Sequence, residues 1–287
     1  MNRRARTERA TSCSIIVCSP RQRKGHPTLK FDANITQLYT EHAFMDRFAA
    51  AAADGFKGVE LRSPYSVPAE AIANQLQQNN LKQVLFNFPA GDWDAGERGI
   101  ACLPGRHEEF ERGLYQAISY AQTLNCQQLN CLAGIAPAGV ERSELEAALV
   151  QNLRLAAETL AEHGIKLQLE VINSQDVPGA LVSTTDQFER IHQMVGSDNL
   201  FLQFDFYHIQ IMHGNLMLNF ERLKDRISHV QIADNPGRHE PGTGEINYDF
   251  IFRALARAGY DGWIGCEYVP GTTTSDGLGW IKALRSE

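Results

Sequence analysis

The chain alternates short apolar runs with longer amphipathic segments from residue 29 onward, and this alternation restricts its fold more than any other feature. Each apolar run has the length and the bounding turn residues of a buried β-strand. The eight predicted strands cover residues 29–35, 57–62, 82–88, 127–134, 165–172, 200–206, 227–233 and 262–268.

The segments between the predicted strands carry apolar residues at three- and four-residue spacings, which indicates helices. Four of these segments end in Gly or Asn just before the next strand, as helix C-termini do. Those residues are Gly55, Asn80, Asn125 and Gly164. The helical segments with the strongest pattern are 44–56, 69–80, 108–125, 144–164 and 185–194.

Strands that alternate with helices favour parallel pairing through right-handed crossovers. Residues 29–287 number 259, close to the ~250 residues of a (β/α)8 barrel. The competing fold is a doubly wound open sheet, but the segment after the first strand lacks a GxGxxG turn. We therefore predict a single α/β domain over residues 29–287, a (β/α)8 TIM barrel.

Residues 1–28 differ from the rest of the chain in charge. They hold seven Lys or Arg and one acidic residue, whereas the remainder holds 20 basic and 33 acidic residues. We predict a basic N-terminal extension here, either disordered or an organelle-targeting peptide. The acidic body is a poor electrostatic match to nucleic acid, so we expect no nucleic-acid partner.

No apolar run approaches the ~20 residues of a membrane helix, and we expect neither a membrane partner nor secretion. The six cysteines show no CxxC spacing, which favours reduced and mostly buried thiols. These features predict a cytoplasmic protein, with organelle targeting by the basic extension as the alternative. The oligomeric state, including a homo-oligomer, is left open.

Polar residues stand where four consecutive strands end, which is the edge of a barrel where active sites lie. Glu170, Asp205, Gln231 and Glu267 are separated by 35, 26 and 36 residues, about one βα unit each. On its strand, each shares the more polar of the two alternating rows, the row expected to face the barrel interior. Clustered carboxylates repel one another unless a cation is present. Three acids and an amide oxygen therefore predict a divalent metal site, for Mg²⁺ or Mn²⁺ rather than zinc.

Other polar residues lie near this predicted mouth. His208 follows Asp205 by three positions, where it can donate to a substrate oxygen or simply pack. The loop 234–249 offers Arg238 and His239 to an anionic substrate group. The loop 89–106 is too long for a bare connection, and such loops often cover a ligand. It carries Trp93, Arg98 and Arg106 as residues able to grip a small polar ligand.

The segments LQLEVIN, QFDFYH, HVQIADNPGRHEPGTGEINYD and GCEY resemble the xylose-isomerase-like barrel superfamily. Within it, AGDWDAGERGIACLPGR and GWIGCEYVPGTTTSDGLGW look like the corresponding loops of the hydroxypyruvate isomerase family. The resemblance spans about Phe31 to Trp280.

The resemblance implies Glu170 and Glu267 as a catalytic acid–base pair. It implies Glu170, Asp205, Gln231 and Glu267 as metal ligands, although a strict metal requirement does not extend to all such isomerases. His208 matches a substrate-contacting position, and Arg238 matches one only loosely.

The implied reaction converts hydroxypyruvate to tartronate semialdehyde (2-hydroxy-3-oxopropanoate). A divalent cation would polarise the substrate oxygens while one glutamate removes the C3 proton and the other delivers a proton at C2. Glu267 is our expected first base. The expected partner is therefore a small hydroxy or oxo acid.

Three alternatives remain at the level of sequence. A 2-oxo-tetronate isomerase would need the same residues and a slightly longer pocket. An apurinic endonuclease of the same barrel type would have a histidine-rich zinc site, which the strand ends here lack. A non-catalytic metabolite-binding barrel is disfavoured because all four site residues are present.

Overall fold

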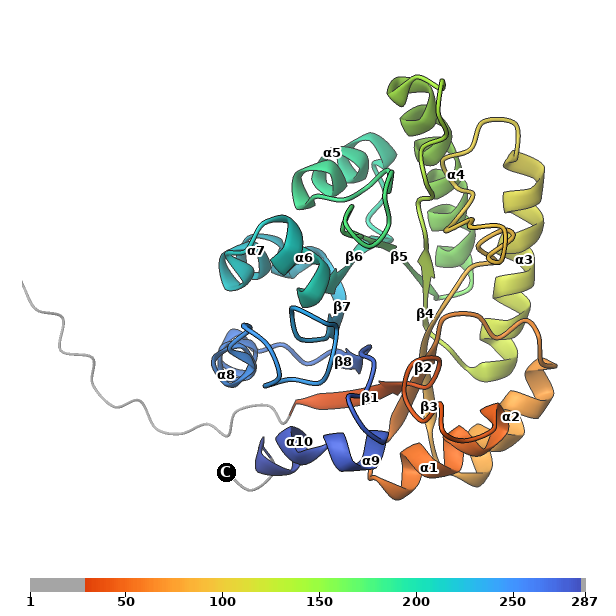
Figure 1. The fold of residues 1–287 in the computed structure, drawn as a ribbon. Helices are drawn as coiled ribbons and strands as arrows, with labels where there is room; N and C mark the ends of the chain where they lie inside the picture. Colours follow the sequence, from red (N-terminus) through yellow and green to blue (C-terminus); the bar gives the residue numbers. More distant parts are fainter. Residues whose placement is uncertain (1–28, 285–287) are drawn as a thin grey trace, which may run out of the picture.

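The structure, a computed structural model, describes residues 29–284, so the predicted basic extension lies outside the described residues. Eight parallel strands form a closed barrel in sequence order, with β1 pairing with β8 (Figure 1). The predicted barrel is confirmed. The strands are β1 Lys30–Asn34, β2 Gly58–Leu61, β3 Lys82–Asn87, β4 Gln128–Cys131, β5 Lys166–Glu170, β6 Leu200–Asp205, β7 Ile227–Ile232 and β8 Trp263–Cys266.

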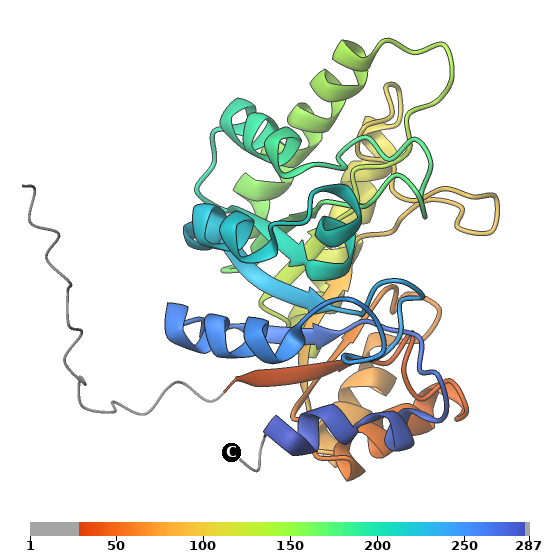
Figure 2. The same cartoon turned by 60° about the vertical axis from the view of Figure 1, so that its left-hand side comes forward.

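Helices surround the barrel on its outside, and Figure 2 shows the same arrangement from a second direction. The major helices are α1 Arg47–Ala53, α2 Ala69–Gln78, α3 His107–Leu124, α4 Arg142–Glu162, α5 Thr185–Val195, α6 Phe206–Met212, α7 Leu216–Leu223 and α8 Tyr248–Ala258. Two short helices, α9 Thr274–Gly277 and α10 Gly279–Leu284, follow the last strand, and the 3-10 turns are η1 Phe44–Asp46 and η2 Lys224–Arg226. Within residues 29–284, no helix combines the length and apolar character required to cross a bilayer.

The predicted ends of the helices are visible in the backbone. Asn125 closes α3 in the left-handed conformation at φ 49°, and Asn80 has φ 51° after α2. Asn is one of the few residues with a side chain that adopt this conformation readily. Asn125 and Asn80 thus mark where the chain leaves α3 and α2 and turns toward the next strand.

The outer row of each strand packs against the helices. On β5, Leu167 and Leu169 are fully buried, and Val171 continues the same row. At the joint between the first and last strands, Trp280 of α10 contacts Phe31 and Phe252 at ring-centroid distances of 5.3 and 5.6 Å. Apolar burial of this kind stabilises by about 25 cal/mol per Å².

The inner row is polar over most of the barrel, unlike the branched apolar interior common in such barrels. All of these inward side chains are buried. They include Asp32, Asn34, Glu60, Gln83, Asn130, Gln168, Glu170, Gln203, Asp205, His229 and Gln231. A polar column therefore runs along the barrel axis up to the mouth.

Candidate active site

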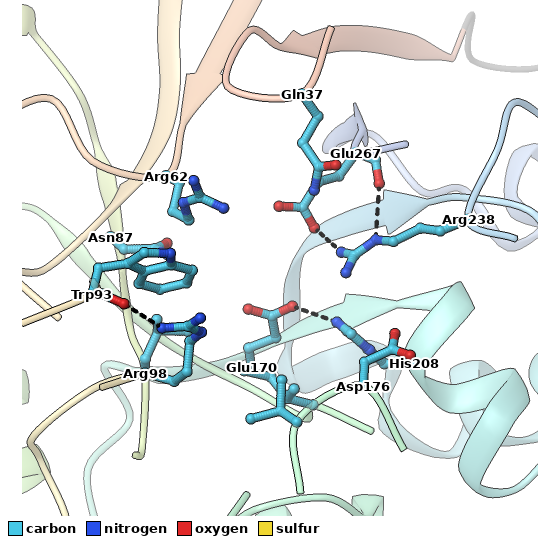
Figure 3. A pocket seen from close by; sticks show the side chains of 13 residues that line it. Gln37, Arg62, Asn87, Trp93, Arg98, Glu170, Asp176, His208, Arg238 and Glu267 are labelled. Carbon is cyan, nitrogen blue, oxygen red and sulfur yellow. Dashed lines mark hydrogen bonds and ion pairs between the residues drawn. The ribbon is translucent and has the colours of Figure 1, made fainter. Parts of the chain in front are cut away.

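A cavity of about 230 Å³ opens at the carboxyl ends of the strands. Its volume lies below the ~300–1,000 Å³ of pockets that hold drug-sized ligands, so it suits a small molecule. Figure 3 shows acidic groups on one side and arginines on both. The lining includes Gln37, Arg62, Asn87, Trp93, Arg98, Glu170, Asp176, His208, Arg238 and Glu267.

Glu170 is the last residue of β5 and points into this cavity (Figure 3). Its Oε2 accepts a hydrogen bond from Asn130 Nδ2 on the neighbouring strand, at 3.1 Å. Burial raises the pKa of Glu170 well above its usual range, and the charges of Glu267 and Asp205 add to the effect. Its environment therefore favours the protonated acid when no cation is present.

Asp205 ends β6 and begins α6, where its Oδ1 accepts from the backbone N–H of Tyr207 at 2.8 Å. Its buried Oδ2 has no hydrogen-bond donor among the described residues. The nearest cationic or ring nitrogens to Oδ2 belong to His208 at 3.5 Å and Arg238 at 3.6 Å. Burial raises the pKa of Asp205 to about 6, although Arg238 opposes the rise.

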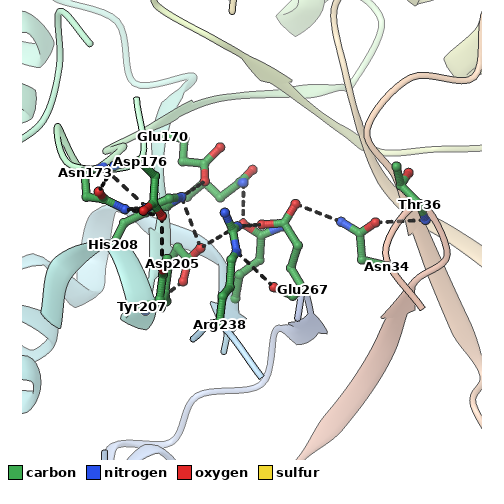
Figure 4. A network of polar contacts seen from close by, with 12 residues as sticks. Asn34, Thr36, Glu170, Asn173, Asp176, Asp205, Tyr207, His208, Arg238 and Glu267 are labelled. Atoms are coloured by element: carbon green, nitrogen blue, oxygen red, sulfur yellow. Dashed lines mark hydrogen bonds and ion pairs between the residues drawn. The ribbon is translucent and has the colours of Figure 1, made fainter. Parts of the chain in front are cut away.

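His208 stands in the first turn of α6, and its hydrogen bonds fix which ring nitrogen carries the proton (Figure 4). The backbone N–H and the side-chain Nδ2 of Asn173 lie 3.3 and 2.7 Å from His208 Nδ1, so Nδ1 accepts. The Asn173 amide cannot be reversed, because its Oδ1 accepts two backbone N–H groups. Burial lowers the pKa of His208 well below its usual range, so the ring is neutral with its hydrogen on Nε2.

That assignment makes His208 a donor toward the cavity. Its Nε2 lies 3.6 Å from Glu170 Oε1 and 3.5 Å from Asp205 Oδ2. A nitrogen that carries hydrogen cannot ligate a metal. The predicted role of His208 as a donor to a substrate oxygen is therefore compatible with the geometry.

Glu267 directly follows β8 and faces Arg238, which lies on the loop after β7 (Figure 4). Arg238 Nη2 is 2.7 Å from Glu267 Oε2, and Asn34 Nδ2 is 3.0 Å from Oε1. Burial raises the pKa of Glu267 to about 7 against the opposing charge of Arg238. Arg238, proposed from sequence for an anionic group, thus serves first as the counter-ion of Glu267.

Gln231 lies on β7 beside Asp205, with which it is in register. Its Nε2 donates to Glu60 Oε1 at 2.7 Å, and its Oε1 accepts from Gln203 at 2.6 Å. The amide oxygen retains a second lone pair, so a ligand role for Gln231 stays a prediction.

Sequence reasoning missed the residues that hold the two glutamates. Asn34 and Asn130 stand on the inner rows of β1 and β4, where an amide could have been noticed by the same parity argument. A further buried group lies deeper in the barrel, where His229 Nε2 is 2.7 Å from Glu60 Oε2. Asp32 lies close to both, and burial together with Glu60 raises its pKa well above the usual range.

The long loop after β3 places two of its three predicted binding residues at the cavity and the third outside it. Trp93 and Arg98 line the cavity. Arg106 does not, because its guanidinium pairs with Glu97 and Glu109. His239, on the other loop, hydrogen-bonds the carbonyl oxygen of Val269 at 2.7 Å and also lies outside the cavity lining.

A divalent cation fits the mouth by the chemistry of its donors. Glu170 and Asp205 offer oxygens within 4.8 Å of each other, and Asp205 Oδ2 has no hydrogen bond to lose among the described residues. Carboxylates forced together by burial gain most from a nearby positive charge. Glu267 lines the same cavity and Gln231 lies beside Asp205 on the next strand, but both already have protein partners.

Comparison with known proteins agrees with the barrel fold. Residues 48–284 match the model of the "Xylose isomerase-like TIM barrel" family. The chain belongs to this family. Hydroxypyruvate isomerase of Escherichia coli K12 is 48% identical over 257 residues, covering 90% of this chain and 100% of the relative. The chain is also 45% identical to 2-oxo-tetronate isomerase of Cupriavidus necator, over 88% of this chain and 97% of the relative.

The crystal structure of "AP endonuclease, family 2" from Brucella melitensis superposes with a TM-score of 0.87 at 42% identity. The match covers 89% of this chain and 99% of that chain. The resemblance drawn from the loop motifs is thereby confirmed at the level of the family.

Proposed function

We propose that the chain is an aldose–ketose-type isomerase that interconverts hydroxypyruvate and tartronate semialdehyde. The observation that carries this proposal is the pair Glu170 and Glu267, which border one small cavity from β5 and from the end of β8. The 48% identity to hydroxypyruvate isomerase over the whole of that relative supports the choice of substrate.

Glu267 is assigned as the base that removes the C3 proton of hydroxypyruvate. It accepts hydrogen bonds from Arg238 and Asn34, and both favour its ionised form. Loss of this proton gives an enediolate, with negative charge spread over the oxygens on C2 and C3. General base catalysis of this kind contributes ~10²–10⁴-fold.

Glu170 is assigned as the acid that delivers a proton to C2. Among the described residues, Asn130 is the one hydrogen-bond donor to its carboxylate, and its surroundings favour the protonated form when no cation is bound. His208, with its hydrogen on Nε2, can donate to an oxygen of the substrate beside Glu170. The proton lost from C3 is matched by the proton gained at C2, and the hydroxyl proton on O3 is matched by the one gained at O2, so the reaction balances with the carboxylate of the substrate unchanged. Proton exchange with water then returns Glu267 to its ionised form and Glu170 to its protonated form.

Glu170, Asp205, Gln231 and Glu267 would hold a divalent cation, Mg²⁺ or Mn²⁺. When bound, such an ion supplies Lewis-acid polarisation of the carbonyl and hydroxyl oxygens. The identity of the ion and its necessity belong to the proposal.

The nearest alternative substrate is 2-oxo-tetronate, because a relative of that name is 45% identical. The test is turnover of hydroxypyruvate and 2-oxo-tetronate side by side by the purified full chain. A clear preference for hydroxypyruvate supports the proposal, whereas turnover of the four-carbon acid alone replaces it with the alternative.

An abasic-site endonuclease is a second candidate, because the similar Brucella protein is named an AP endonuclease. The small cavity and the acidic body argue against a DNA substrate. Incubation with an abasic oligonucleotide tests it directly. Strand cleavage without turnover of either acid would overturn the isomerase proposal.

A further inference from the structure

One wall of the cavity consists of two arginines stacked on a tryptophan. The Arg62 Cζ lies 4.4 Å from the centre of the Trp93 ring, and the Arg98 Cζ lies 3.8 Å from it. Figure 3 shows one guanidinium above the indole and the other below it, across the cavity from Arg238. We call Arg62, Trp93 and Arg98 the arginine wall.

Among the residues that the structure describes, neither guanidinium group of the arginine wall has a carboxylate ion-pair partner. Among the described residues, ion pairs are formed by Arg238 and Arg106 but by neither Arg62 nor Arg98. Arg98 Nη1 donates only to backbone oxygens, those of Trp93 at 3.0 Å and Glu97 at 2.7 Å. Two half-buried guanidinium groups therefore face the cavity without an ion-pair partner among the described residues.

The remaining charges of the cavity are arranged on the other side. Arg238 is neutralised by Glu267, and Asp176 accepts hydrogen bonds from Asn173 and Tyr207. Burial lowers the pKa of Arg62; the charge of Glu267 opposes this shift, and the charges of Arg98 and Arg238 add to it, so the guanidinium groups repel one another across the cavity. An anionic group bound at the arginine wall would relieve that repulsion.

We propose that Arg62 and Arg98, held by Trp93, bind the carboxylate of the substrate and select short 2-oxo and hydroxy acids over neutral sugars. This inference rests on the proposed isomerase function and assigns the part of the site that recognises the unreactive end of the substrate. A guanidinium presents a planar set of donors that matches a carboxylate, and stacking on an indole fixes its plane.

Trp93 and Arg98 of the arginine wall are held in place by the loop after β3, which carries them. The backbone N–H of Asp92 donates to Glu97 Oε2 at 2.6 Å, and Glu97 also pairs with Arg106. The backbone N–H of Gly99 donates to Ala90 at 2.9 Å, which closes the loop on itself. Pre-ordering of the binding groups lowers the entropy lost when a small acid binds.

The experiment compares three variants of the full chain: Arg62→Met, Arg98→Met and the control Arg112→Met. Arg112 is an exposed residue of α3 outside the cavity, and its replacement makes the same change in net charge. For hydroxypyruvate, we expect KM to rise about 10- to 100-fold in each wall variant, as for loss of a charge-assisted hydrogen bond, with kcat changed less than about threefold. The control should match the wild type.

A binding measurement separates this inference from the proposed activity. Calorimetry would compare 3-hydroxypropanoate with its neutral amide, 3-hydroxypropanamide, neither of which can be isomerised. We expect wild type to bind the acid at least about 10-fold more tightly than the amide, and Arg62→Met and Arg98→Met to lose that preference.

The outcomes are distinct. Absence of hydroxypyruvate turnover in wild type defeats the proposed activity but leaves the acid–amide preference to judge the arginine wall. Equal binding of acid and amide by wild type, or a preference that survives in both wall variants, overturns the carboxylate assignment even if hydroxypyruvate is isomerised.

Discussion

Asn34 on the first strand holds Glu267 after the last strand through a hydrogen bond of 3.0 Å from its Nδ2 to Glu267 Oε1. The same nitrogen lies 3.0 Å from Glu60 Oε1, and the Asn34 Oδ1 accepts the backbone N–H of Thr36. The amide therefore has one orientation, with both hydrogens directed at carboxylates. It links the proposed base at the mouth to the buried acids below.

Replacement of Asn34 by Ala should weaken catalysis by altering Glu267. Loss of a donor to the carboxylate raises the pKa of Glu267, so the acidic limb of the kcat/KM profile should move to higher pH. We expect kcat to fall about 10-fold at neutral pH. The control is Asn79→Ala, because Asn79 bonds only Gln75 on the surface helix α2. A fall in rate with an unmoved pH limb would assign Asn34 a purely structural role.

Glu170→Gln and Glu267→Gln should each reduce hydroxypyruvate turnover by at least ~100-fold, because each removes one proton-transfer group while keeping its size. Circular dichroism and the melting temperature check that both variants fold. The matched control is Glu158→Gln on the outer helix α4. Near-normal turnover in either site variant would rule out the two-glutamate mechanism.

Removal of the metal should make the stability of the protein depend on pH, because the carboxylates at the barrel mouth then repel one another without a cation. Burial raises the pKa of Asp205 to about 6 and of Glu267 to about 7, above the ~4 of these groups in an unfolded chain. Between the unfolded pKa of ~4 and the folded pKa values of about 6 and 7, the folded state binds more protons than the unfolded state. The stability of the metal-free protein therefore falls as pH rises through this range.

A divalent cation needs the ionised carboxylates, so its stabilising effect should grow over the same range. After EDTA treatment, addition of Mn²⁺ or Mg²⁺ should raise Tm more at pH 8 than at pH 5.5. Asp205→Asn should abolish the gain. If neither ion changed the Tm at either pH, the result would contradict the predicted metal site.

Gly99→Ala should displace the loop that carries Trp93 and Arg98. Gly99 has φ 106°, and a Cβ there would lie 2.3 Å from the carbonyl oxygen of Leu132. We expect loss of about 1–3 kcal/mol of stability and a higher KM for hydroxypyruvate. Gly105→Ala is the control, since Gly105 has a positive φ of 82° but no atom within 4 Å of the added Cβ. Equal effects of both substitutions would attribute the change to backbone strain alone.

The sequence predicted the eight strands because short apolar runs alternate with amphipathic helical segments, four of which end in Gly or Asn. The two-residue period of a strand placed Glu170, Asp205 and Gln231 on the inner rows, and the structure has them buried there. Their roles as ligands or catalysts are still predictions, since parity fixes a direction but no chemistry.

The partners of these residues were beyond sequence reasoning. Asn34 and Glu267 are 233 positions apart and meet only because β1 pairs with β8 when the barrel closes. Likewise, Arg98 and Arg106 stand in one loop with the same charge. Their different roles become visible only in the folded loop, where Arg106 forms ion pairs with Glu97 and Glu109 whereas Arg98 faces the cavity.

The barrel interior is polar, whereas the layer between the strands and the helices is apolar, so the two regions serve different purposes. The apolar ring between strands and helices supplies the burial that keeps the barrel folded, whereas the axis holds Gln168, Gln203 and other buried amides and acids. Random substitution should therefore act on two separate properties. Changes in the ring should lower the yield of folded protein, whereas changes along the axis should leave much folded protein that works poorly. Selection for folding alone would preserve the residues of the apolar ring and allow substitutions to accumulate among the polar residues along the axis.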